Sequence, residues 1–266
     1  MDEKNFSHSF MVLAYKESPY LESCVQSCVS QTRKSKVIVT TSTPSEYIDR
    51  IAKKYNVTVK INPSGGSITL DWNFAYKSSD TQYVTLAHQD DIYLPDYTKK
   101  MEEIVRRYPG NILTFSGYYE IKGERLKKFS INPFIKSIIL LPFYLFRNSV
   151  RKPSRKKRML GFGSPIPCPS VMYQKDKISD FEFSKDYKIN LDWDAWIRLA
   201  GEKGDFLYVR KPLIAHRIHD ASETSFGISE NRRQTEDQEI FKRIWGNGVL
   251  SKMITRLYSL SYKLNK

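Results

Sequence analysis

Two adjacent carboxylates, Asp90 and Asp91, stand two residues after an apolar run at positions 83–87 that is typical of a strand. Buried strands rarely end in neighbouring like charges, because the charges repel each other and each loses its hydration. A divalent cation and a phosphate-bearing ligand would remove both penalties, since Mg²⁺ is usually held by one or two carboxylates together with substrate phosphates. The pair therefore predicts a metal–nucleotide site at the carboxyl end of a strand.

The segments around this pair alternate between two hydrophobic periods. Short apolar or β-branched runs predict strands, and apolar residues at helical spacing predict helices between them. The predicted strands are 9–14, 36–41, 57–61, 83–87 and 112–115, and the predicted helices are 19–31, 45–55, 68–77 and 97–108. This alternation indicates parallel βαβ units in a doubly wound sheet, which binds its ligand beyond the carboxyl ends of the strands, where the acidic pair lies.

The composition fits a globular α/β protein. With 266 residues, 40% of them hydrophobic and 13% aromatic, the chain can form one large domain or two small ones. Three cysteines suit a reducing compartment, and we expect Cys24 and Cys28 to be buried small residues rather than half of a metal site. The N-terminus lacks a signal-peptide pattern, and no stretch reaches the roughly 20 apolar residues that span a bilayer. A cytoplasmic protein is expected.

The formal net charge of +14 calls for an anionic partner, such as nucleic acid, anionic lipid or a phosphorylated substrate. An apolar segment at 134–146 precedes seven basic residues and no acidic one within 147–158. This basic run is either a solvated loop after a core helix or a polybasic element on anionic lipid, where each basic residue adds about 1 kcal/mol. The tail at 249–266 shows a similar mixture of apolar and basic residues.

Four segments, in their order along the chain, resemble the family 2 inverting glycosyltransferases of the GT-A fold. They begin at positions 14, 39, 89 and 190, and the resemblance covers roughly residues 8–225. It implies an α/β, GT-A-like, doubly wound mixed sheet with a Rossmann-like nucleotide-binding half and a helical, basic C-terminal region. The expected division is 1–120 for the nucleotide-sugar half, 121–225 for the acceptor and catalytic half of the same domain with a basic apolar insert at 133–160, and 226–266 for a helical extension that can touch a membrane.

The first segment resembles the loop that borders the nucleotide in this family. The resemblance implies that Ala14 and Tyr15 lie against the donor, with the Tyr15 ring stacked on the base and Glu17 hydrogen-bonded to the base or ribose. An ordinary strand-to-helix loop is the alternative.

The second segment departs from the family pattern. Thr41 stands where the family usually has an acidic residue that contacts the base, so Thr41 and Ser42 are expected to meet the nucleotide without that carboxylate. Gly65 and Gly66 resemble an Asn-x-Gly segment whose open backbone admits a ligand, although a tight turn explains them nearly as well. Asn73, on the following helix, is expected to help hold this loop.

The third segment, Gln89-Asp90-Asp91, resembles the family's DxD motif with glutamine at its first position. The resemblance implies that Asp91 binds Mn²⁺ or Mg²⁺ and that Gln89 and Asp90 contact the donor. A later segment at 216–224 resembles one that closes over the diphosphate, where His219 would complete the metal site and Arg217 would neutralise phosphate. Acids lining a helix N-terminus are the alternative explanation.

The fourth segment resembles the family's Glu-Asp sequence followed by an aromatic and an Arg-Leu helix. Asp192 aligns with the catalytic base, while leucine at position 191 replaces the usual glutamate and leaves Asp194 as a second candidate. Trp193 and Trp196 are expected to exclude water and to offer flat surfaces to a sugar, and Ser170 is placed beside the acceptor. Two acids capping a helix would explain the pair structurally.

These assignments imply a metal-dependent inverting glycosyltransferase that uses a UDP-linked sugar and a saccharide or lipid-linked acceptor in cell-surface polysaccharide biosynthesis, at the inner face of the membrane. A nucleic-acid-binding protein would explain the charge, but no recognisable module is present, so no nucleic-acid partner is expected. A sugar-phosphate nucleotidyltransferase would show a Gly-rich basic loop after the first strand, and the sequence at 15–18, YKES, differs from that pattern.

Overall fold

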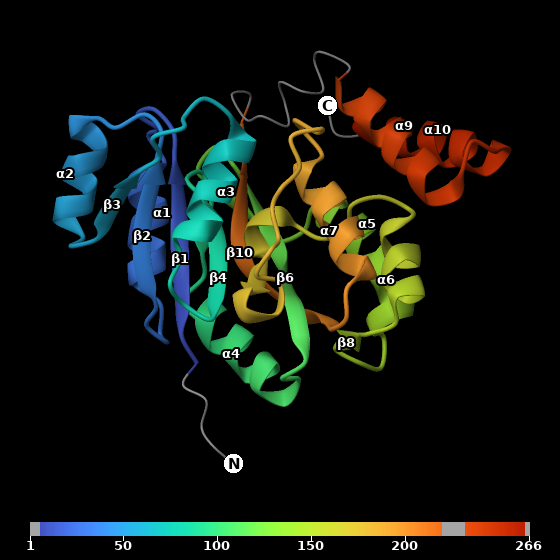
Figure 1. Cartoon of the computed structure of the whole chain (residues 1–266), viewed down its shortest axis with the longest axis horizontal. Helices are drawn as coiled ribbons and strands as arrows, with labels where there is room; N and C mark the ends of the chain where they lie inside the picture. Colours follow the sequence, from blue (N-terminus) through green and yellow to red (C-terminus); the bar gives the residue numbers. More distant parts are fainter. Residues whose placement is uncertain (1–5, 220–231, 264–266) are drawn as a thin grey trace.

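The computed structural model describes residues 6–219 and 232–263 (Figure 1). Within these ranges the strands form one ten-stranded sheet in the order β3-β2-β1-β4-β9-β6-β10-β5, with β7 paired to β6 and β8 paired to β10. Helices lie on both faces of this sheet (Figure 1). Parallel and antiparallel pairs both occur, so the predicted mixed α/β architecture is confirmed.

The first half of the chain builds the parallel part of the sheet. Its strands are β1 (His8–Ala14), β2 (Lys36–Thr41), β3 (Thr58–Ile61) and β4 (Tyr83–His88), and its helices are α1 (Leu21–Val29), α2 (Glu46–Lys54), α3 (Ile68–Ser78) and α4 (Tyr97–Arg107). β1 lies between β2 and β4, which pairs Ala14 with Thr41 and Leu13 with His88. The loops after these three strands therefore meet at one edge.

Two of these helices begin at a serine cap. The side chains of Ser45 and Ser67 accept the backbone N–H of Ile48 and Leu70 at the starts of α2 and α3. Such caps satisfy donors that a helix start otherwise leaves unpaired. The four helices of this half begin and end within two residues of their predicted bounds.

The rest of the sheet contains the predicted strand 112–115, which is part of β6, and strands that the sequence patterns do not predict. β9 (Met172–Gln174) runs antiparallel between β4 and β6 (Asn111–Lys122), and β10 (Asp205–Ile218) runs parallel to β6. β5 (Ile92–Tyr93) pairs antiparallel with β10, which brings the end of β10 back to the acidic turn after β4. The remaining elements are β7 (Arg125–Lys127), β8 (Ser149–Val150), α5 (Ile131–Tyr144), α6 (Pro153–Leu160), α7 (Leu191–Gly201), α9 (Arg232–Trp245), α10 (Val249–Lys263) and 3-10 turns at 168–170 and 175–177.

Alternate residues of the central strand β1 enter two different cores. Phe10 and Val12 pack in one apolar cluster with α1 and α4, whereas Met11 packs in the other cluster with residues of α3, α7 and α9. This division follows from the two-residue period of a strand, whose side chains point to opposite faces of the sheet. Cys24 and Cys28 are buried and unbridged in the first cluster, as predicted.

The basic run at 147–158 is neither a plain loop nor wholly exposed. It forms β8 and most of α6, and Lys156 is completely buried, with its ammonium group donating to the carbonyl oxygens of Glu202 at 2.7 Å and Gly204 at 3.1 Å. Arg151 forms two hydrogen bonds with Asp205. Lys156 therefore contradicts the solvated-loop interpretation, whereas the Arg151 side chain is 74% exposed and reaches the start of β10 from solvent.

Helix α5 presents an apolar outer stripe to solvent. The stripe consists of Phe134, Ile138, Leu141 and the following Leu145, with exposed fractions of 65%, 51%, 52% and 45%. Their spacing of three and four residues puts them on one side of the helix. Among the described residues, no helix is long and apolar enough to cross a membrane.

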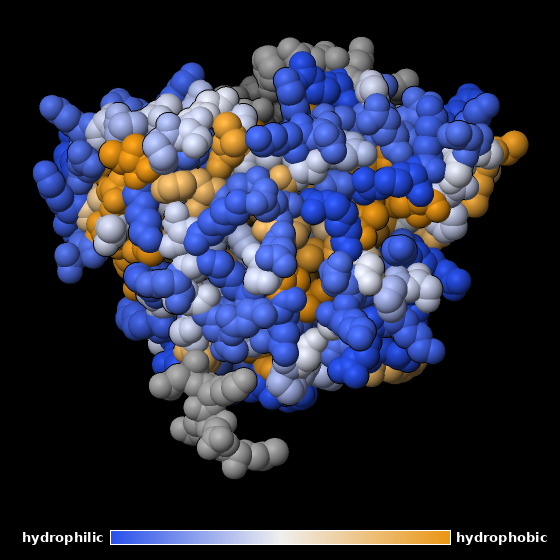
Figure 2. All heavy atoms as spheres, viewed as in Figure 1, coloured by the Kyte–Doolittle hydropathy of each residue, from blue (hydrophilic) through white to orange (hydrophobic). Residues whose placement is uncertain are grey.

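The C-terminal helices pack on the second half of the domain. Phe241 of α9 meets Trp193 of α7 edge-on at 5.0 Å, and the Trp245 indole donates to the carbonyl of Gly161. In Figure 1, α9 and α10 lie at the upper right. Figure 2 shows the same face as largely hydrophilic, with scattered apolar side chains between the charged ones.

Candidate active site

Asp91 is a buried carboxylate at the carboxyl edge of the sheet. Its Oδ1 accepts hydrogen bonds from Nδ1 of His216 and from the backbone N–H of Arg217, both at 2.9 Å. Burial opposes ionisation of Asp91, but the charge and hydrogen bond of His216 outweigh it and hold the pKa of Asp91 below its usual value. The other oxygen, Oδ2, is buried and has no hydrogen-bond partner among the described residues.

Asp90 is more accessible and lies beside the end of β10. Its Oδ2 is 3.1 Å from Nε2 of His219, and its backbone carbonyl accepts a hydrogen bond from Nε of Arg217. The Arg217 guanidinium lies over the ring of Tyr20, 4.3 Å from the centroid. The structure therefore brings the two acids together with Arg217 and His219, which are distant in sequence. Ser222, Glu223 and Thr224, which belong to the same family-like segment, lie outside the described residues.

Gln89 fastens the acidic turn to the loop after β1. Its Oε1 accepts the backbone N–H of Tyr15 at 2.9 Å, and its Nε2 donates to the carbonyl of Tyr15 at 3.3 Å. The Tyr15 ring remains 48% exposed, and Glu17 is exposed on the same loop. Ala14 is buried at the end of β1. Hydrogen bonds thus hold the backbone of Tyr15, and the ammonium group of Lys16 lies over its ring, 5.2 Å from the centroid.

A carboxylate from α3 occupies the region where Thr41 replaces the family's acid. Asp71 accepts hydrogen bonds from the Ser42 hydroxyl at 2.9 Å and from the Asn62 amide at 2.7 Å. Thr41 is buried, and its hydroxyl accepts the backbone N–H of Thr43. No sequence pattern indicates this role of Asp71, because only the fold brings α3 against the ends of β2 and β3.

The glycines beside this cluster adopt turn conformations. Gly65 has φ of +24° and Gly66 has φ of +93°, which side chains rarely adopt. A Cβ at Gly66 would meet nothing within 4 Å, so this backbone faces open space. Asn73 does not reach these glycines in the structure: its amide exchanges two hydrogen bonds with the backbone of Phe183, at 2.7 and 3.0 Å. Asn73 therefore holds the loop that precedes α7.

Asp192 lies at the start of α7 in a cationic setting. Burial raises the pKa of its carboxyl group, and the charges of Arg233 and Lys136 oppose that rise. Its Oδ1 accepts the backbone N–H of Trp193. Desolvation makes the Asp192 carboxylate a stronger base, and the two cations limit the rise of its pKa and so favour the ionised form.

Asp194 is held by two arginines. Its carboxyl oxygens are 2.8 Å from Nε of Arg198 and 2.7 Å from Nη1 of Arg243, and its side chain is 2% exposed. This carboxylate joins α7 to α9 and has little access to solvent. Of the two acids proposed as the base, Asp194 has the contacts of a structural ion pair.

The three residues assigned to the acceptor are buried in the structure. Trp193 and Trp196 have no exposed surface, and the Trp193 indole donates to the carbonyl of Leu160. Ser170 is also fully buried, and its hydroxyl donates to the carbonyl of Pro167. In this conformation neither indole offers a face to a sugar, which corrects that expectation: α7 is apolar on most of its surface because α6 and α9 cover it.

Helix α9 supplies a support for Asp192 that the sequence analysis missed. The carboxylate of Glu236 accepts three consecutive backbone N–H groups, from Lys188, Ile189 and Asn190, at 2.8–3.0 Å. These groups immediately precede α7. The C-terminal helix therefore fixes the segment that carries Asp192.

The charges of both Asp91 and Asp192 affect Cys168. Burial, and then the charges of Asp192 and Asp91, raise the pKa of the Cys168 thiol well above its usual value. The structure thus contains Asp91, whose Oδ2 has no hydrogen-bond partner among the described residues, and Asp192, whose pKa is raised.

The acidic turn fits a divalent cation only together with ligand oxygens. Among the described residues, no group of three or more His, Cys, Asp or Glu side chains could hold a metal ion by itself. The buried, unpartnered Oδ2 of Asp91 is suited to a hard cation, and the neighbouring Asp90 lies 3.1 Å from Nε2 of His219, which follows β10. This donor set agrees with Mg²⁺ or Mn²⁺ sites that take one or two carboxylates and complete their shell with substrate phosphates.

Residues 9–180 match the sequence profile of Glycosyl transferase family 2, and the chain belongs to that family. The family and the sheet define a glycosyltransferase with a GT-A fold. No curated protein gives a significant sequence match.

Several solved glycosyltransferase structures share this fold at low sequence identity. Residues 1–349 of S. aureus TarS superpose with a TM-score of 0.63 and 13% identity, over 88% of this chain and 64% of that one. Glucosyl-3-phosphoglycerate synthase from Mycobacterium tuberculosis, in complex with Mn²⁺, UDP and glucosyl-3-phosphoglycerate, gives 0.58 and 15%, over 91% and 81%. The mannosyltransferase PcManGT from Pyrobaculum calidifontis, in complex with GDP-Man and Mn²⁺, gives 0.56 and 11%, over 92% and 66%.

Proposed function

We propose that this glycosyltransferase transfers a sugar from a UDP-linked donor to a hydroxyl group of a saccharide or lipid-linked saccharide, with inversion at the anomeric carbon, in cell-surface polysaccharide assembly. The observation that carries the proposal is the pairing of Asp91, whose Oδ2 is buried without a partner, with Asp192, whose carboxyl group is desolvated beside two cations. Structural neighbours crystallised with UDP and with UDP-GlcNAc support the choice of donor.

Asp192 acts as the general base. Its carboxylate takes the proton of the acceptor hydroxyl, whose oxygen forms the new bond to the anomeric carbon. The bond between that carbon and the donor's diphosphate oxygen breaks on the opposite face, and the nucleoside diphosphate leaves with the electron pair. Lys136 and Arg233 keep Asp192 ionised before the proton arrives.

Asp91, Asp90 and His219 would hold Mn²⁺ or Mg²⁺ beside the diphosphate. When bound, such a cation supplies Lewis-acid neutralisation of the charge on the leaving diphosphate. Arg217 orders this region by bonding to the carbonyls of Asp90 and Gly123 and adds positive charge beside the same ligand. His216 positions Asp91 through its hydrogen bond to Oδ1.

The base of the donor is proposed to lie between Tyr15 and Asp71. The exposed Tyr15 ring offers a stacking face, and Asp71 supplies the carboxylate that position 41 lacks. Ser42, Gly65 and Gly66 border the same space, since a Cβ built at Gly65 lies 3.6 Å from the Cβ of Ser42.

We also propose that the protein contacts an anionic membrane through the outer stripe of α5. Exposed basic side chains follow this stripe closely in sequence, at Arg147, Lys152, Lys157 and Arg158. Apolar side chains that enter the interface and cations that meet anionic head groups act together in such binding.

Release of UDP from a panel of UDP-sugars, with Mn²⁺ or Mg²⁺ and with EDTA, tests the proposed transfer. Asp192→Asn is expected to lower turnover about 10²–10⁴-fold, the usual contribution of a positioned base, with donor binding unchanged. Exposed Asp80, which pairs with Lys36, gives the matched control Asp80→Asn. Equal turnover in wild type and Asp192→Asn would refute the role of Asp192 as the general base. Turnover that is insensitive to EDTA would refute the dependence on a metal ion.

A further inference from the structure

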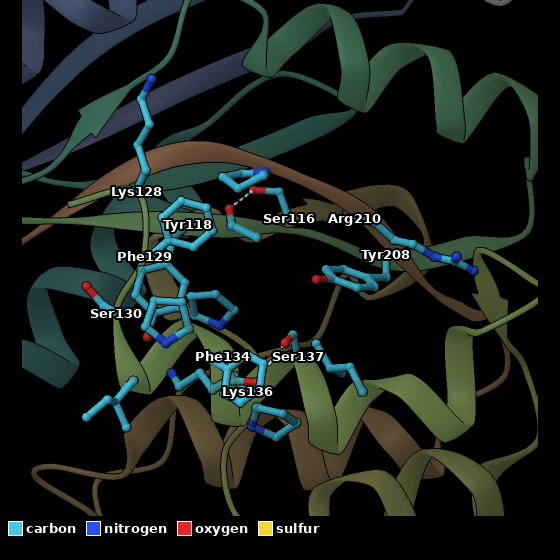
Figure 3. A pocket seen from close by; sticks show the side chains of 17 residues that line it. Ser116, Tyr118, Lys128, Phe129, Ser130, Phe134, Lys136, Ser137, Tyr208 and Arg210 are labelled. Carbon is cyan, nitrogen blue, oxygen red and sulfur yellow. Dashed lines mark hydrogen bonds between the residues drawn. The ribbon is translucent and has the colours of Figure 1, made fainter. Parts of the chain in front are cut away.

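A cavity of about 500 Å³ lies beside the candidate active site, between the sheet and α5. Strand β6 contributes Tyr118, β10 contributes Tyr208, and α5 contributes Phe134 and Leu140. Figure 3 shows the labelled side chains of these elements gathered around one space. Its volume falls within the range of about 300–1,000 Å³ that is typical of pockets for small organic ligands.

Two contacts connect this cavity to the two ends of the active site. The Tyr118 ring meets His216, the partner of Asp91, with 6.1 Å between ring centroids. The ammonium group of Lys136 lies 5.4 Å from the centroid of the Tyr118 ring, and its charge acts on Asp192. A molecule in the cavity would therefore contact Tyr118, which meets His216, and Lys136, whose charge acts on Asp192.

The wall of the cavity is apolar with positive charges and without negative ones. Lys136, Lys128 and Arg210 line it, and none of the described lining residues is acidic. The Arg210 guanidinium donates to the carbonyls of Leu145 and Arg147, and the Lys128 side chain extends away from the space in Figure 3, so Lys136 is the cation that faces a ligand. Burial lowers the pKa of Lys136 to about 8, so at pH 7 the ammonium group is still mostly charged. The charges of Asp192 and Glu120 offset part of the cost of burying this cation in apolar surroundings, and a bound anion would offset more of it.

The cavity is continuous with the outer stripe of α5. Phe134 belongs to both, because it lines the cavity and is 65% exposed. Phe129 and Ile131 also line the cavity, and they are 96% and 57% exposed. A hydrocarbon chain that left the cavity here would pass onto an apolar surface rather than into water.

We propose that this cavity binds the junction between the anionic head group and the hydrocarbon chain of an amphiphilic acceptor. The head group lies against Lys136, the chain extends past Phe134 along α5, and the sugar attached to the head group reaches Asp192. This assignment rests on the proposed function, because it names the class of acceptor for that transfer.

Monomeric dodecyl phosphate, titrated into the full chain at pH 7 without donor or metal, tests the assignment. The wild type is expected to bind one molecule saturably, at least tenfold more tightly than it binds inorganic phosphate or the neutral dodecyl maltoside. Ser137→Trp, which fills the cavity from an exposed position of α5, and Phe134→Ser are each expected to weaken binding at least tenfold. Lys136→Met is expected to remove the preference for dodecyl phosphate over dodecyl maltoside.

Ile61→Ser is the matched control for Phe134→Ser, because Ile61 is 55% exposed on β3 and belongs neither to the cavity lining nor to the outer stripe of α5. Equal weakening in both variants would mean that the amphiphile does not use the cavity, and it would overturn the proposal. Binding of inorganic phosphate alone, or equal binding of the neutral amphiphile, would also overturn it. Thermal unfolding of each variant confirms folding, and the titration is independent of sugar transfer, so its failure is distinguishable from failure of the proposed function.

Discussion

Nδ1 of His216 lies 2.9 Å from Oδ1 of Asp91, although the two residues are 125 positions apart in the chain. The contact exists because β10 returns to the edge of the sheet where β4 ends and pairs there with β5. It occupies one oxygen of Asp91 and leaves the other without a partner. The fold therefore orients this carboxylate before any ligand arrives.

Replacing Asp91 is expected to remove metal-dependent binding of UDP. At about 100 times its dissociation constant, UDP with Mn²⁺ should stabilise the wild type by about 2.7 kcal/mol, whereas Asp91→Asn should show little additional stabilisation from Mn²⁺. Thermal unfolding with UDP alone, Mn²⁺ alone and both gives this difference, and it is insensitive to any loss of stability in the unliganded variant. An equal Mn²⁺-dependent shift in Asp91→Asn and wild type would exclude Asp91 as a metal ligand.

The pH dependence of turnover should report Asp192 and Lys136. Because burial raises the pKa of Asp192, activity should fall on the acid side at a higher pH than an ordinary aspartate would give. Lys136, with a pKa lowered to about 8, loses its charge as the pH rises through that value. Lys136→Met removes a cation that favours ionised Asp192, so the acid limb of kcat should move to higher pH. Lys128→Met is the control, and an unmoved acid limb in Lys136→Met would contradict the coupling.

Asp194 is expected to matter for stability rather than for chemistry. Asp194→Ala leaves Arg198 and Arg243 without their carboxylate and should lower the free energy of unfolding by about 3 kcal/mol, the lower end for a broken buried pair, because both arginines reach solvent. Denaturant unfolding measures this loss. Turnover of the remaining folded protein should stay within about tenfold of the wild type, since the base is Asp192. A stable but inactive Asp194→Ala would reverse the assignment of the two acids.

Local patterns sufficed for the elements of the first half. Their strands and helices follow from apolar periodicity and from caps such as Ser45 and Ser67, which depend only on near neighbours. The pairing of β10 with β6 and β5 depends on residues about a hundred positions apart, so the hydrophobic periodicity of a local segment cannot predict it. The acidic turn was recognisable, but its contacts with His216 were not.

The sequence does not predict which polar and aromatic side chains are buried. Trp193 and Trp196 beside two acids suggested a sugar platform, yet both rings are buried, Trp193 against Phe241 of α9 and Trp196 against Tyr173 of β9. Lys156 stood in a run of basic residues and is nevertheless buried among backbone carbonyls. Asp71 lacked any local signal, because its partners Ser42 and Asn62 lie on other loops.

The outer stripe of α5 should determine binding to anionic vesicles. Ile138→Glu combined with Leu141→Glu places two negative charges where apolar side chains would enter the interface. Since full burial of such a side chain is worth about 1.5–3 kcal/mol, co-sedimentation with phosphatidylglycerol-containing vesicles should weaken about tenfold or more. Ile61→Glu is the control, because Ile61 is 55% exposed on β3, away from the stripe. Comparable losses in both proteins would mean that added negative charge, rather than the stripe, governs binding.

His8 should make the fold sensitive to acid. Its ring is buried between the hydroxyls of Ser35 and Thr85, and burial lowers its pKa to about 3. Above pH 6.5 the histidine is neutral in both the folded and the unfolded chain, so it contributes no pH dependence. As the pH falls from there towards 3, the unfolded chain takes up a proton that the folded chain does not.

This difference in proton uptake lowers the free energy of unfolding by about 1.4 kcal/mol for each unit by which the pH falls. His8→Gln removes this contribution, so the difference in unfolding free energy between wild type and variant should change with that slope between pH 6 and pH 4. Denaturant unfolding at several pH values measures it, and a constant offset from altered packing leaves the slope unchanged. Parallel curves for the two proteins would show that His8 accepts a proton in the folded state, through a rearrangement of the hydroxyl partners that surround it.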